Sequence, residues 1–168
     1  FDGTGEHACF GGADKRVSVW RCMASTPPRA VALPGECVGA RFLGAQRIAC
    51  ASKARADCLS LLQWGAEPEA PLSFVCKTTC DSAPVAMCVS DTSASLATAH
   101  LDKSLRLWAV GSASLEQVWE VEDRHDQRIT SVCFAPAGAQ SLLSTAWDGH
   151  LKMTDVRSRE VTLDIAGS

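Results

Sequence analysis

The sequence predicts an all-β protein in which one small antiparallel sheet is repeated along the chain. Trp20, Trp64 and Trp108 follow one another at a constant interval of 44 residues. Short runs of alternating apolar and polar residues, separated by Gly, Pro and Asp, recur about four times within each interval. Such runs are typical of strands joined by tight turns. Because no stretch of useful length has helical periodicity, we expect a repeating architecture without helices.

Two heptapeptides show the repeat most clearly. Residues 14–20 read Asp-Lys-Arg-Val-Ser-Val-Trp, and residues 102–108 read Asp-Lys-Ser-Leu-Arg-Leu-Trp. Each begins with a turn pair and continues as an alternating strand that ends on tryptophan. Residues 148–154 form a weaker copy, in which Thr154 takes the place of the tryptophan.

Four repeats follow from this spacing, at approximately residues 1–35, 36–80, 81–125 and 126–168. Turn signals divide the repeats into short strands, which we expect at residues 7–11, 16–21, 29–33, 38–43, 46–52, 59–64, 72–77, 85–89, 96–100, 104–110, 115–121, 129–134, 141–146, 150–156 and 161–165. The first six residues read as a strand end and an Asp-Gly turn. The chain is therefore expected to begin within a repeat and to be a fragment of a longer protein.

The strand count per repeat indicates how the sheets are arranged. A single twisted sheet of four strands cannot bury both of its faces, so successive sheets have to stack on one another. Four strands in about 44 residues fit the blade of a β-propeller better than a sandwich. The predicted fold is therefore a propeller fragment of about four four-stranded antiparallel blades.

The composition excludes several classes of function. Hydrophobic residues make up 46% and charged residues 21% of the 168 residues, which is typical of a globular protein. The net charge of -3 argues against a phosphate-binding surface, so no nucleic-acid partner is expected. No apolar run reaches the roughly 18 residues of a membrane span, and no signal pattern opens the chain, so no direct membrane insertion is expected.

Nine cysteines are present, and none forms a Cys-x-x-Cys pair. Four of them, Cys9, Cys50, Cys88 and Cys133, lie in apolar strand-like runs, where a free thiol behaves as a small hydrophobic group. The sequence also contains no Asn and hence no site for N-glycosylation. These observations indicate reduced, buried thiols and a cytoplasmic location.

Patterns that would carry chemistry are weak. Residues 3–8 fit Gly-x-Gly-x-x-Ala, but a dinucleotide site needs a preceding strand and a following helix, so a glycine-rich hairpin is expected. No Gly-x-Ser-x-Gly elbow is present. His125 with Asp126, or His100 with Asp102, would offer metal ligands, but ordering of turns and strand ends is the simpler role. No catalytic residue, cofactor or metal is therefore predicted.

The pattern resembles the WD-repeat (WD40) β-propeller family across the whole chain. Residues 129–136 resemble the inner strand and turn of that family, and residues 144–149 resemble its Ser-Gly-Ser-x-Asp-Gly strand and turn. Arg124-His125 resembles its Gly-His pair. None of the three spaced tryptophans is followed by Asp, and only Thr154 keeps the Asp that follows in the family.

The resemblance implies a hydrogen-bonded tetrad of His, Ser or Thr, Asp and Trp within a blade. Its members would be Asp14 and Trp20 in the first repeat, Thr98, Asp102 and Trp108 in the third, and His125, Ser144 and Asp148 in the fourth. Each set is incomplete: Phe10 stands where the first repeat needs Ser or Thr, the third lacks the His, and Thr154 replaces the fourth Trp. The second repeat offers Trp64, with Cys58 and Asp57 near the Asp position.

Residues 100–108 and 150–158 also resemble successive repeats of the Atg16-type autophagy scaffold. This likeness implies a propeller that helps to place a lipid-conjugation machinery. The coiled coil that accompanies the propeller in that scaffold is absent from these 168 residues.

The function expected from these features is that of a non-catalytic scaffold that binds other proteins or peptides through its blade loops. The loops favoured for contact are residues 14–16, 55–57, 102–103 and 122–128. The rest of a longer chain would supply the missing blades, and the fragment alone should be unstable or self-associating.

The alternative is an enzyme, or an adaptor of another pathway, that uses a propeller frame. An enzyme would carry several acids or histidines on its inner strands. The expected inner strands, residues 38–43, 85–89 and 129–134, carry only Arg41 as a charged residue, which favours the scaffold.

Overall fold

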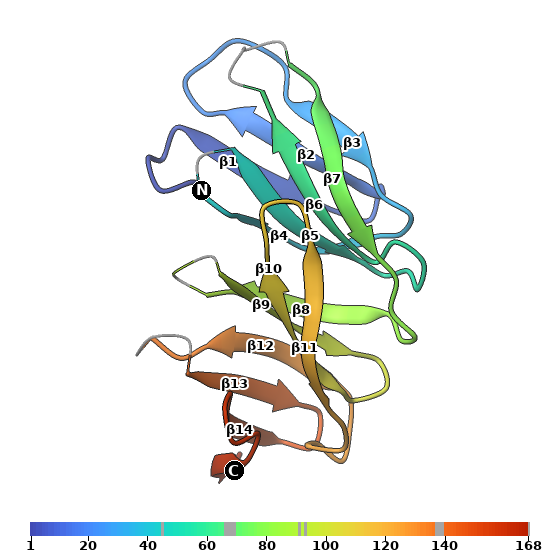
Figure 1. Ribbon diagram of the computed structural model, residues 1–168, viewed down its shortest axis with the longest axis vertical. Coiled ribbons are helices and arrows are strands. Elements are labelled where there is room, and N and C mark those ends of the chain that lie inside the picture. The colour runs from blue at the N-terminus through green and yellow to red at the C-terminus, as the bar shows by residue number, and fades with distance from the viewer. Residues whose placement is uncertain (45, 66–69, 91, 93, 137–139, 168) are drawn as a thin grey trace. The chain divides into compact units, whose positions relative to one another are not determined.

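The computed structural model describes residues 1–168 except 45, 66–69, 91, 93, 137–139 and 168. The described residues form β-strands and no helix, which confirms the predicted all-β class (Figure 1). The strands are β1 (His7–Gly11), β2 (Arg16–Arg21), β3 (Arg29–Ala32), β4 (Cys37–Phe42), β5 (Arg47–Ser52), β6 (Leu59–Trp64), β7 (Leu72–Thr78), β8 (Pro84–Val89), β9 (Ser95–His100), β10 (Leu105–Val110), β11 (Leu115–Val121), β12 (Ile129–Phe134), β13 (Ser141–Ala146), β14 (His150–Asp155) and β15 (Val161–Ala166).

These strands form four antiparallel sheets in which each strand pairs with its neighbour in sequence. Three sheets have four strands, β4 to β7, β8 to β11 and β12 to β15, as predicted. In the described part of the chain the first sheet has only three strands, β1 to β3. Each sheet lies within one of the four predicted repeats, while the repeat boundaries themselves stay a prediction.

The three four-stranded sheets share two irregularities in pairing. The register shifts near the start of the first strand, at Cys37/Gly39, Pro84/Ala86 and Ile129/Ser131. It shifts again between the third and fourth strands, at Leu61/Leu62, Leu107/Trp108 and Met153/Thr154. Bulges bend and twist a strand locally. Their recurrence at matching positions shows that the three sheets are copies of one structural unit.

The chain divides into two compact units, residues 1–83 and 84–168, with two sheets in each. The core of the first unit brings together Val17 and Val19 of β2, Ile48 of β5, and Leu62 and Trp64 of β6. All five side chains are buried because one face of each strand is apolar at every second residue. This packing joins the three-stranded sheet to the sheet of β4 to β7.

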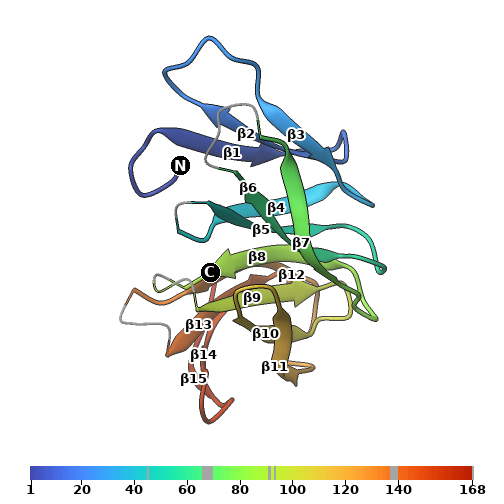
Figure 2. The same ribbon diagram turned by 45° about the horizontal axis from the view of Figure 1, so that its top comes forward.

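The core of the second unit joins its two sheets in the same way. Leu105 and Leu107 of β10 and Trp119 of β11 share one apolar cluster with Ile129 and Val132 of β12. Strand β12 packs beside β8 and β9, and the two views in Figures 1 and 2 agree on this placement. The first strands of the two sheets therefore lie next to each other within this unit.

Two sequence expectations need correction. Cys133 is exposed rather than buried, because strand alternation turns its side chain to the face opposite Val132. Cys9 is only half-buried. Residues 3–6 lead into β1, which begins at His7.

Candidate functional site

A buried polar chain runs through the sheet of β12 to β15. His125, in the loop before β12, lies 2.9 Å through Nδ1 from Oδ2 of Asp148 and 2.9 Å through Nε2 from Oγ of Ser144. Asp148 occupies the turn between β13 and β14, where its carboxylate also accepts the backbone N–H groups of Asp126 and His150, each at 3.0 Å. The structure thus brings together all three residues named for the fourth repeat.

The carboxylate of Asp148 is held in its charged form. Burial by itself would raise the pKa of this group, but the hydrogen bonds from the His150 N–H, His125 and the Asp126 N–H outweigh burial. The pKa is lowered from 3.8 to about 2. Asp148 therefore stays ionised at neutral pH and fixes the loop before β12 to the turn after β13.

Thr154 occupies the place of the tryptophan in this repeat. Its side chain is fully buried, and its hydroxyl has no hydrogen-bond partner among the described residues. A threonine is too short to reach the Ser144 hydroxyl in the way that an indole would. The polar chain of this repeat therefore ends at Ser144.

The order Ser144, His125, Asp148 matches that of a charge-relay system, but its surroundings do not suit acyl transfer. Ser144 and His125 are each only 1% exposed. Ser144 also lies on β13, between two paired strands. A substrate carbonyl could reach its hydroxyl only if this sheet opened. The arrangement is suited to holding a loop on a sheet.

A second buried chain crosses the sheet of β8 to β11. The indole Nε1–H of Trp108 donates to Oγ1 of Thr98 at 2.9 Å, and the same oxygen lies 2.7 Å from Nε2 of His100. All three side chains are at most 2% exposed. No histidine was predicted for this repeat, because the corresponding residue of the fourth repeat, His125, comes from the loop before its sheet. The structure supplies His100 from within β9 itself.

Asp102 is hydrogen-bonded to Ser104 and Arg106. It accepts hydrogen bonds from the backbone N–H and the hydroxyl of Ser104, at 3.0 and 2.7 Å, and from Nη2 of Arg106 at 3.2 Å. Arg106 is 3% exposed and also donates through Nη2 to Oε1 of Glu120 at 2.7 Å. Burial would raise the pKa of Asp102, but the Ser104 bonds and the Arg106 charge lower it. Arg106 and Glu120 were missed because their pairing depends on strand register.

The tryptophans of the first two repeats belong to no such chain among the described residues, and the first repeat instead has Asp2 Oδ2 at 3.0 Å from His7 Nδ1. Asp14 accepts the Arg16 N–H at 3.2 Å, and no hydrogen bond joins it to Trp20 in the described part of the chain. Trp20 is 40% exposed. Trp64 is buried and packs edge-on against Phe42, with ring centroids 5.6 Å apart. Its role is hydrophobic packing.

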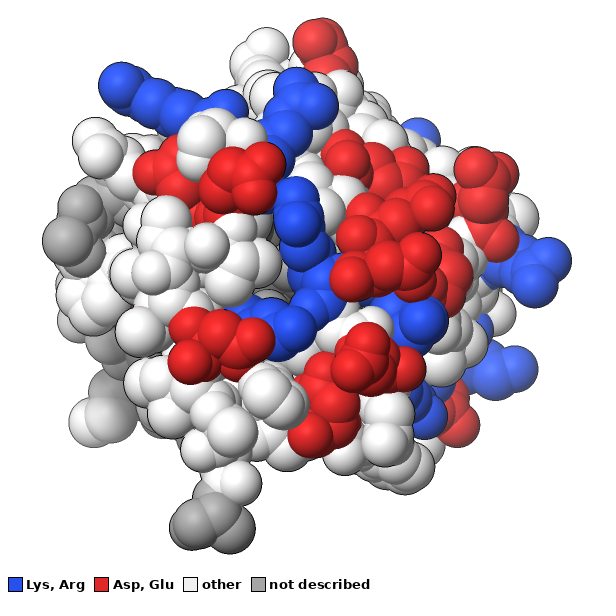
Figure 3. All heavy atoms as spheres, turned by 90° about the horizontal axis from the view of Figure 1, so that it is seen from below, with Lys and Arg blue, Asp and Glu red and all other residues white. Residues whose placement is uncertain are grey.

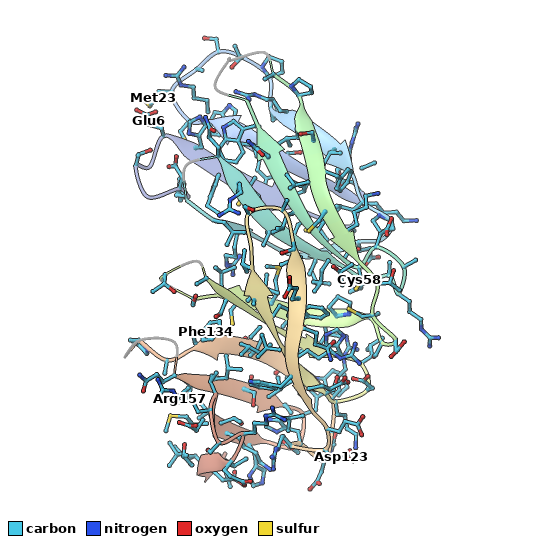
Figure 4. The ribbon with its side chains drawn as sticks, in the orientation of Figure 1. Glu6, Met23, Cys58, Asp123, Phe134 and Arg157 are labelled. Carbon is cyan, nitrogen blue, oxygen red and sulfur yellow. The ribbon has the colours of Figure 1, made fainter. Side chains whose placement is uncertain are left out.

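Three surface segments of the second unit are tied together. We call them the loop cluster: the turn 102–103, the loop 122–128 and the turn 157–159. Nζ of Lys103 lies 3.1 Å from Oδ1 of Asp123, and Nη2 of Arg124 donates to the Arg159 carbonyl at 2.6 Å. Lys152 donates to the Arg124 carbonyl at 2.7 Å. The face turned to the viewer in Figure 3 shows Lys and Arg beside groups of Asp and Glu, and Asp123 of the loop cluster is labelled in Figure 4.

The described residues hold no group of three or more His, Cys, Asp or Glu side chains placed to bind a metal ion. Within the same described ranges, no helix has the length and apolar character needed to cross a membrane.

Comparison with known proteins identifies a repeat family within part of the chain. Residues 74–109 and 117–155 each match the family described as WD domain, G-beta repeat. The chain is also similar to WD repeat-containing protein 90 of Mus musculus, with 35% identity over 96 residues. That match covers 57% of this chain and 5% of the mouse protein.

The segment of residues 74–155 therefore carries two WD40 repeats.

The WD40 repeats are offset from the sheets by one strand. The match at 74–109 begins within β7, the last strand of one sheet, and ends on β10, the third strand of the next. The match at 117–155 runs in the same way from β11 to β14. One sequence repeat therefore contributes the last strand of one sheet and three strands of the following sheet. The buried chains of His125 and Thr98 fall within these two WD40 repeats.

The family resemblance in the sequence is thereby confirmed, and WD40 repeats indicate a protein-interaction scaffold that is typically non-catalytic. The narrower likeness to an Atg16-type scaffold receives no support from these matches. Membership of the eight named residues in a structural tetrad stays a prediction, although the structure shows hydrogen bonds within the third and fourth sets.

Proposed function

We propose that this chain is a non-catalytic scaffold that binds a partner protein through the loop cluster of residues 102–103, 122–128 and 157–159. The observation that carries the proposal is the set of contacts that hold these segments in one arrangement. Lys103 with Asp123, and Arg124 with the Arg159 carbonyl, join parts of the chain that are far apart in sequence. A surface held in advance loses less conformational freedom when a partner binds.

The charges of this surface point to the chemistry of the partner. Glu122, Asp126 and Arg128 of the loop 122–128 are exposed. Both signs of charge are present, so a partner with a complementary mixed surface fits better than a nucleic acid. Binding of this kind weakens as the salt concentration rises.

The experiment reverses the charges of two exposed side chains, Glu122 and Arg128. We expect Glu122→Lys with Arg128→Glu to weaken partner binding by roughly tenfold, because facing like charges replace complementary ones. Partners are captured from cell extract with the 168-residue chain and quantified by mass spectrometry against the double variant. The matched control is Glu6→Lys in the first unit, an exposed acid on the loop before β1 (Figure 4).

The melting temperature of each variant separates contact from folding. A partner that is lost with the double variant, kept with Glu6→Lys and accompanied by an unchanged melting temperature supports the proposal. Equal capture by all three proteins, or loss of capture in step with loss of thermal stability, contradicts it.

Some charged positions in the loops favoured by the sequence are less suitable for this test. Asp57 pairs with Lys77 at 3.2 Å, and the Arg55 carbonyl accepts the Cys80 N–H at 3.0 Å. Asp123 is likewise paired with Lys103. Charge reversal at these positions would change internal contacts as well as any partner contact.

The proposal also covers the longer protein that contains this chain, its location in the cell and its pathway. The chain spans 5% of the length of the mouse relative, and further repeats of a longer protein would complete the propeller. A cytoplasmic location agrees with the nine thiols, none of which is in a disulfide. The autophagy role suggested by the Atg16-type likeness stays a prediction, and an added N-terminal heptad segment in the longer protein would support it.

A further inference from the structure

Two cysteines far apart in sequence meet in the sheet of β4 to β7. Cys58 immediately precedes β6, and Cys80 follows β7 by two residues. Strands β6 and β7 pair with Leu59 opposite Thr78, so their ends place the two cysteines side by side. The distance between the two Sγ atoms is 2.7 Å. Figure 4 shows Cys58 beside the C-terminal end of β7.

Backbone hydrogen bonds on both sides of Cys58 and Cys80 hold the two cysteines next to each other. The Cys80 N–H donates to the Arg55 carbonyl at 3.0 Å, and the Asp57 N–H donates to Oγ1 of Thr79 at 3.3 Å. The Ser52 N–H donates to the Cys58 carbonyl at 2.8 Å. The segments that carry the two thiols are therefore fixed to each other, and no rearrangement of the backbone is needed to bring the sulfur atoms together.

The pair is enclosed, and the Cys58 thiol is held in its protonated form. Cys58 is 1% and Cys80 is 4% exposed. The hydrogen bond with Cys80, together with burial, raises the pKa of the Cys58 thiol. A protonated thiol is a poor nucleophile, so the pair is stable in reducing conditions and reacts only when an oxidant reaches it.

We propose that Cys58 and Cys80 form a disulfide when the protein meets a peroxide. The sulfur of one thiol attacks an oxygen of hydrogen peroxide, the O–O bond breaks, and the thiol proton passes to the leaving hydroxide, which gives a sulfenic acid and one water. The second sulfur then attacks the sulfenic sulfur, the S–O bond breaks, and the second thiol proton passes to the leaving hydroxide, which departs as a second water while the S–S bond forms. Overall, two S–H bonds and one O–O bond are replaced by one S–S bond and two waters.

The disulfide would join the last two strands of its sheet, β6 and β7. It closes residues 59–79 into a loop and ties the start of β6 to the segment after β7. A cross-link of this size restricts the unfolded chain and raises the melting temperature by roughly 10 °C. Oxidation would therefore stiffen the first unit and leave the loop cluster of the second unit chemically unchanged.

The test uses the 168-residue chain, treated with hydrogen peroxide, quenched with N-ethylmaleimide and analysed by non-reducing peptide mapping. Trypsin places Cys58 and Cys76 in one peptide, residues 56–77, and Cys80 and Cys88 in another, residues 78–103. A linked pair of these peptides, 2 Da below the summed mass of their thiol forms, is expected. The link should be lost in Cys58→Ser and in Cys80→Ser and kept in Cys76→Ser and in Cys88→Ser.

Two further measurements distinguish a specific loss of the disulfide from a loss caused by misfolding of the variant. The reduced melting temperature shows whether each serine variant is folded, and Cys58→Ala provides a second, apolar replacement. Oxidation in guanidinium chloride should scramble links among the nine cysteines, because the specificity comes from the folded sheet. Retention of both thiols in excess peroxide, a link that survives Cys58→Ser, or an equal mixture of links in the folded protein would overturn the proposal.

Discussion

Single hydroxyl groups show how buried polar atoms are managed in this protein. The Thr98 hydroxyl accepts the indole N–H of Trp108 and contacts His100, whereas the Thr154 hydroxyl is buried with no partner among the described residues. The two threonines do not hold corresponding places in their sheets, because Thr154 stands where the third repeat has Trp108. A buried polar group without a hydrogen-bond partner destabilises the folded state, whereas a hydrogen-bonded one stabilises it.

Replacement of each threonine by valine is expected to give opposite results. Thr98→Val keeps the shape but leaves the Trp108 N–H without its acceptor, so the free energy of unfolding should fall by about 2 kcal/mol. Thr154→Val removes an unpaired hydroxyl and should leave stability unchanged or raise it by about 1 kcal/mol. Urea unfolding followed by tryptophan fluorescence measures both. Equal destabilisation by the two substitutions would show that Thr154 has a partner after all.

Among the elements, three turns that begin with Asp share one backbone feature: those between β1 and β2, β9 and β10, and β13 and β14. The residue after the Asp has a positive φ in each of them: 60° at Lys15, 69° at Lys103 and 80° at Gly149. This left-handed conformation is strained for a residue with a Cβ atom and unstrained for glycine. The Asp accepts the N–H two residues ahead in each case and holds the turn.

The positive φ at Gly149 predicts that its replacement lowers the free energy of unfolding. Gly149→Ala should lower the free energy of unfolding by about 1 kcal/mol, because alanine is strained at this φ although no atom blocks its Cβ. Lys103→Gly should raise it by about 0.5 kcal/mol after the loss of the exposed Asp123 pair. Gly12→Ala, a glycine without positive φ, is the matched control and should change little. Thermal unfolding compares the three, and a loss at Gly12 as large as that at Gly149 would argue against backbone strain as the cause.

At the scale of the whole molecule, apolar sheet faces meet solvent at several places. Leu163 and Ile165 of β15 are 41% and 50% exposed, and Phe10 and Trp20 of the three-stranded sheet are 51% and 40% exposed. Strand β1 also lies at the edge of its sheet, with one row of backbone groups free to pair. Contiguous apolar surface of this kind favours association.

We therefore expect the 168-residue chain to self-associate in solution. Sedimentation velocity should show an average mass that rises with concentration, and Leu163→Lys with Ile165→Lys should shift it toward the monomer. Met23→Lys is the control, because Met23 is 96% exposed but lies in a loop (Figure 4). A compact wild-type monomer at every concentration tested would refute the expectation.

Much of the fold could be predicted from local patterns. Alternation along residues 16–21 and 105–110 and the Asp-containing turns mark strands and their ends, because both depend on neighbours in sequence. The polar chain of His125, Ser144 and Asp148 was also accessible, since the family resemblance names its positions. The role of His100 was not, because it contacts Thr98 only through the alternation that puts both on one face of β9.

The sequence by itself determined the repeated antiparallel sheet, the turns and the family, because spacing, alternation and turn chemistry act over a few residues. Tertiary structure alone decided which side chains meet: Arg106 with Glu120, and Cys58 with Cys80. Those contacts depend on the register of paired strands, and a shift by one residue would turn each side chain to the opposite face. No local pattern in the chain fixes that register.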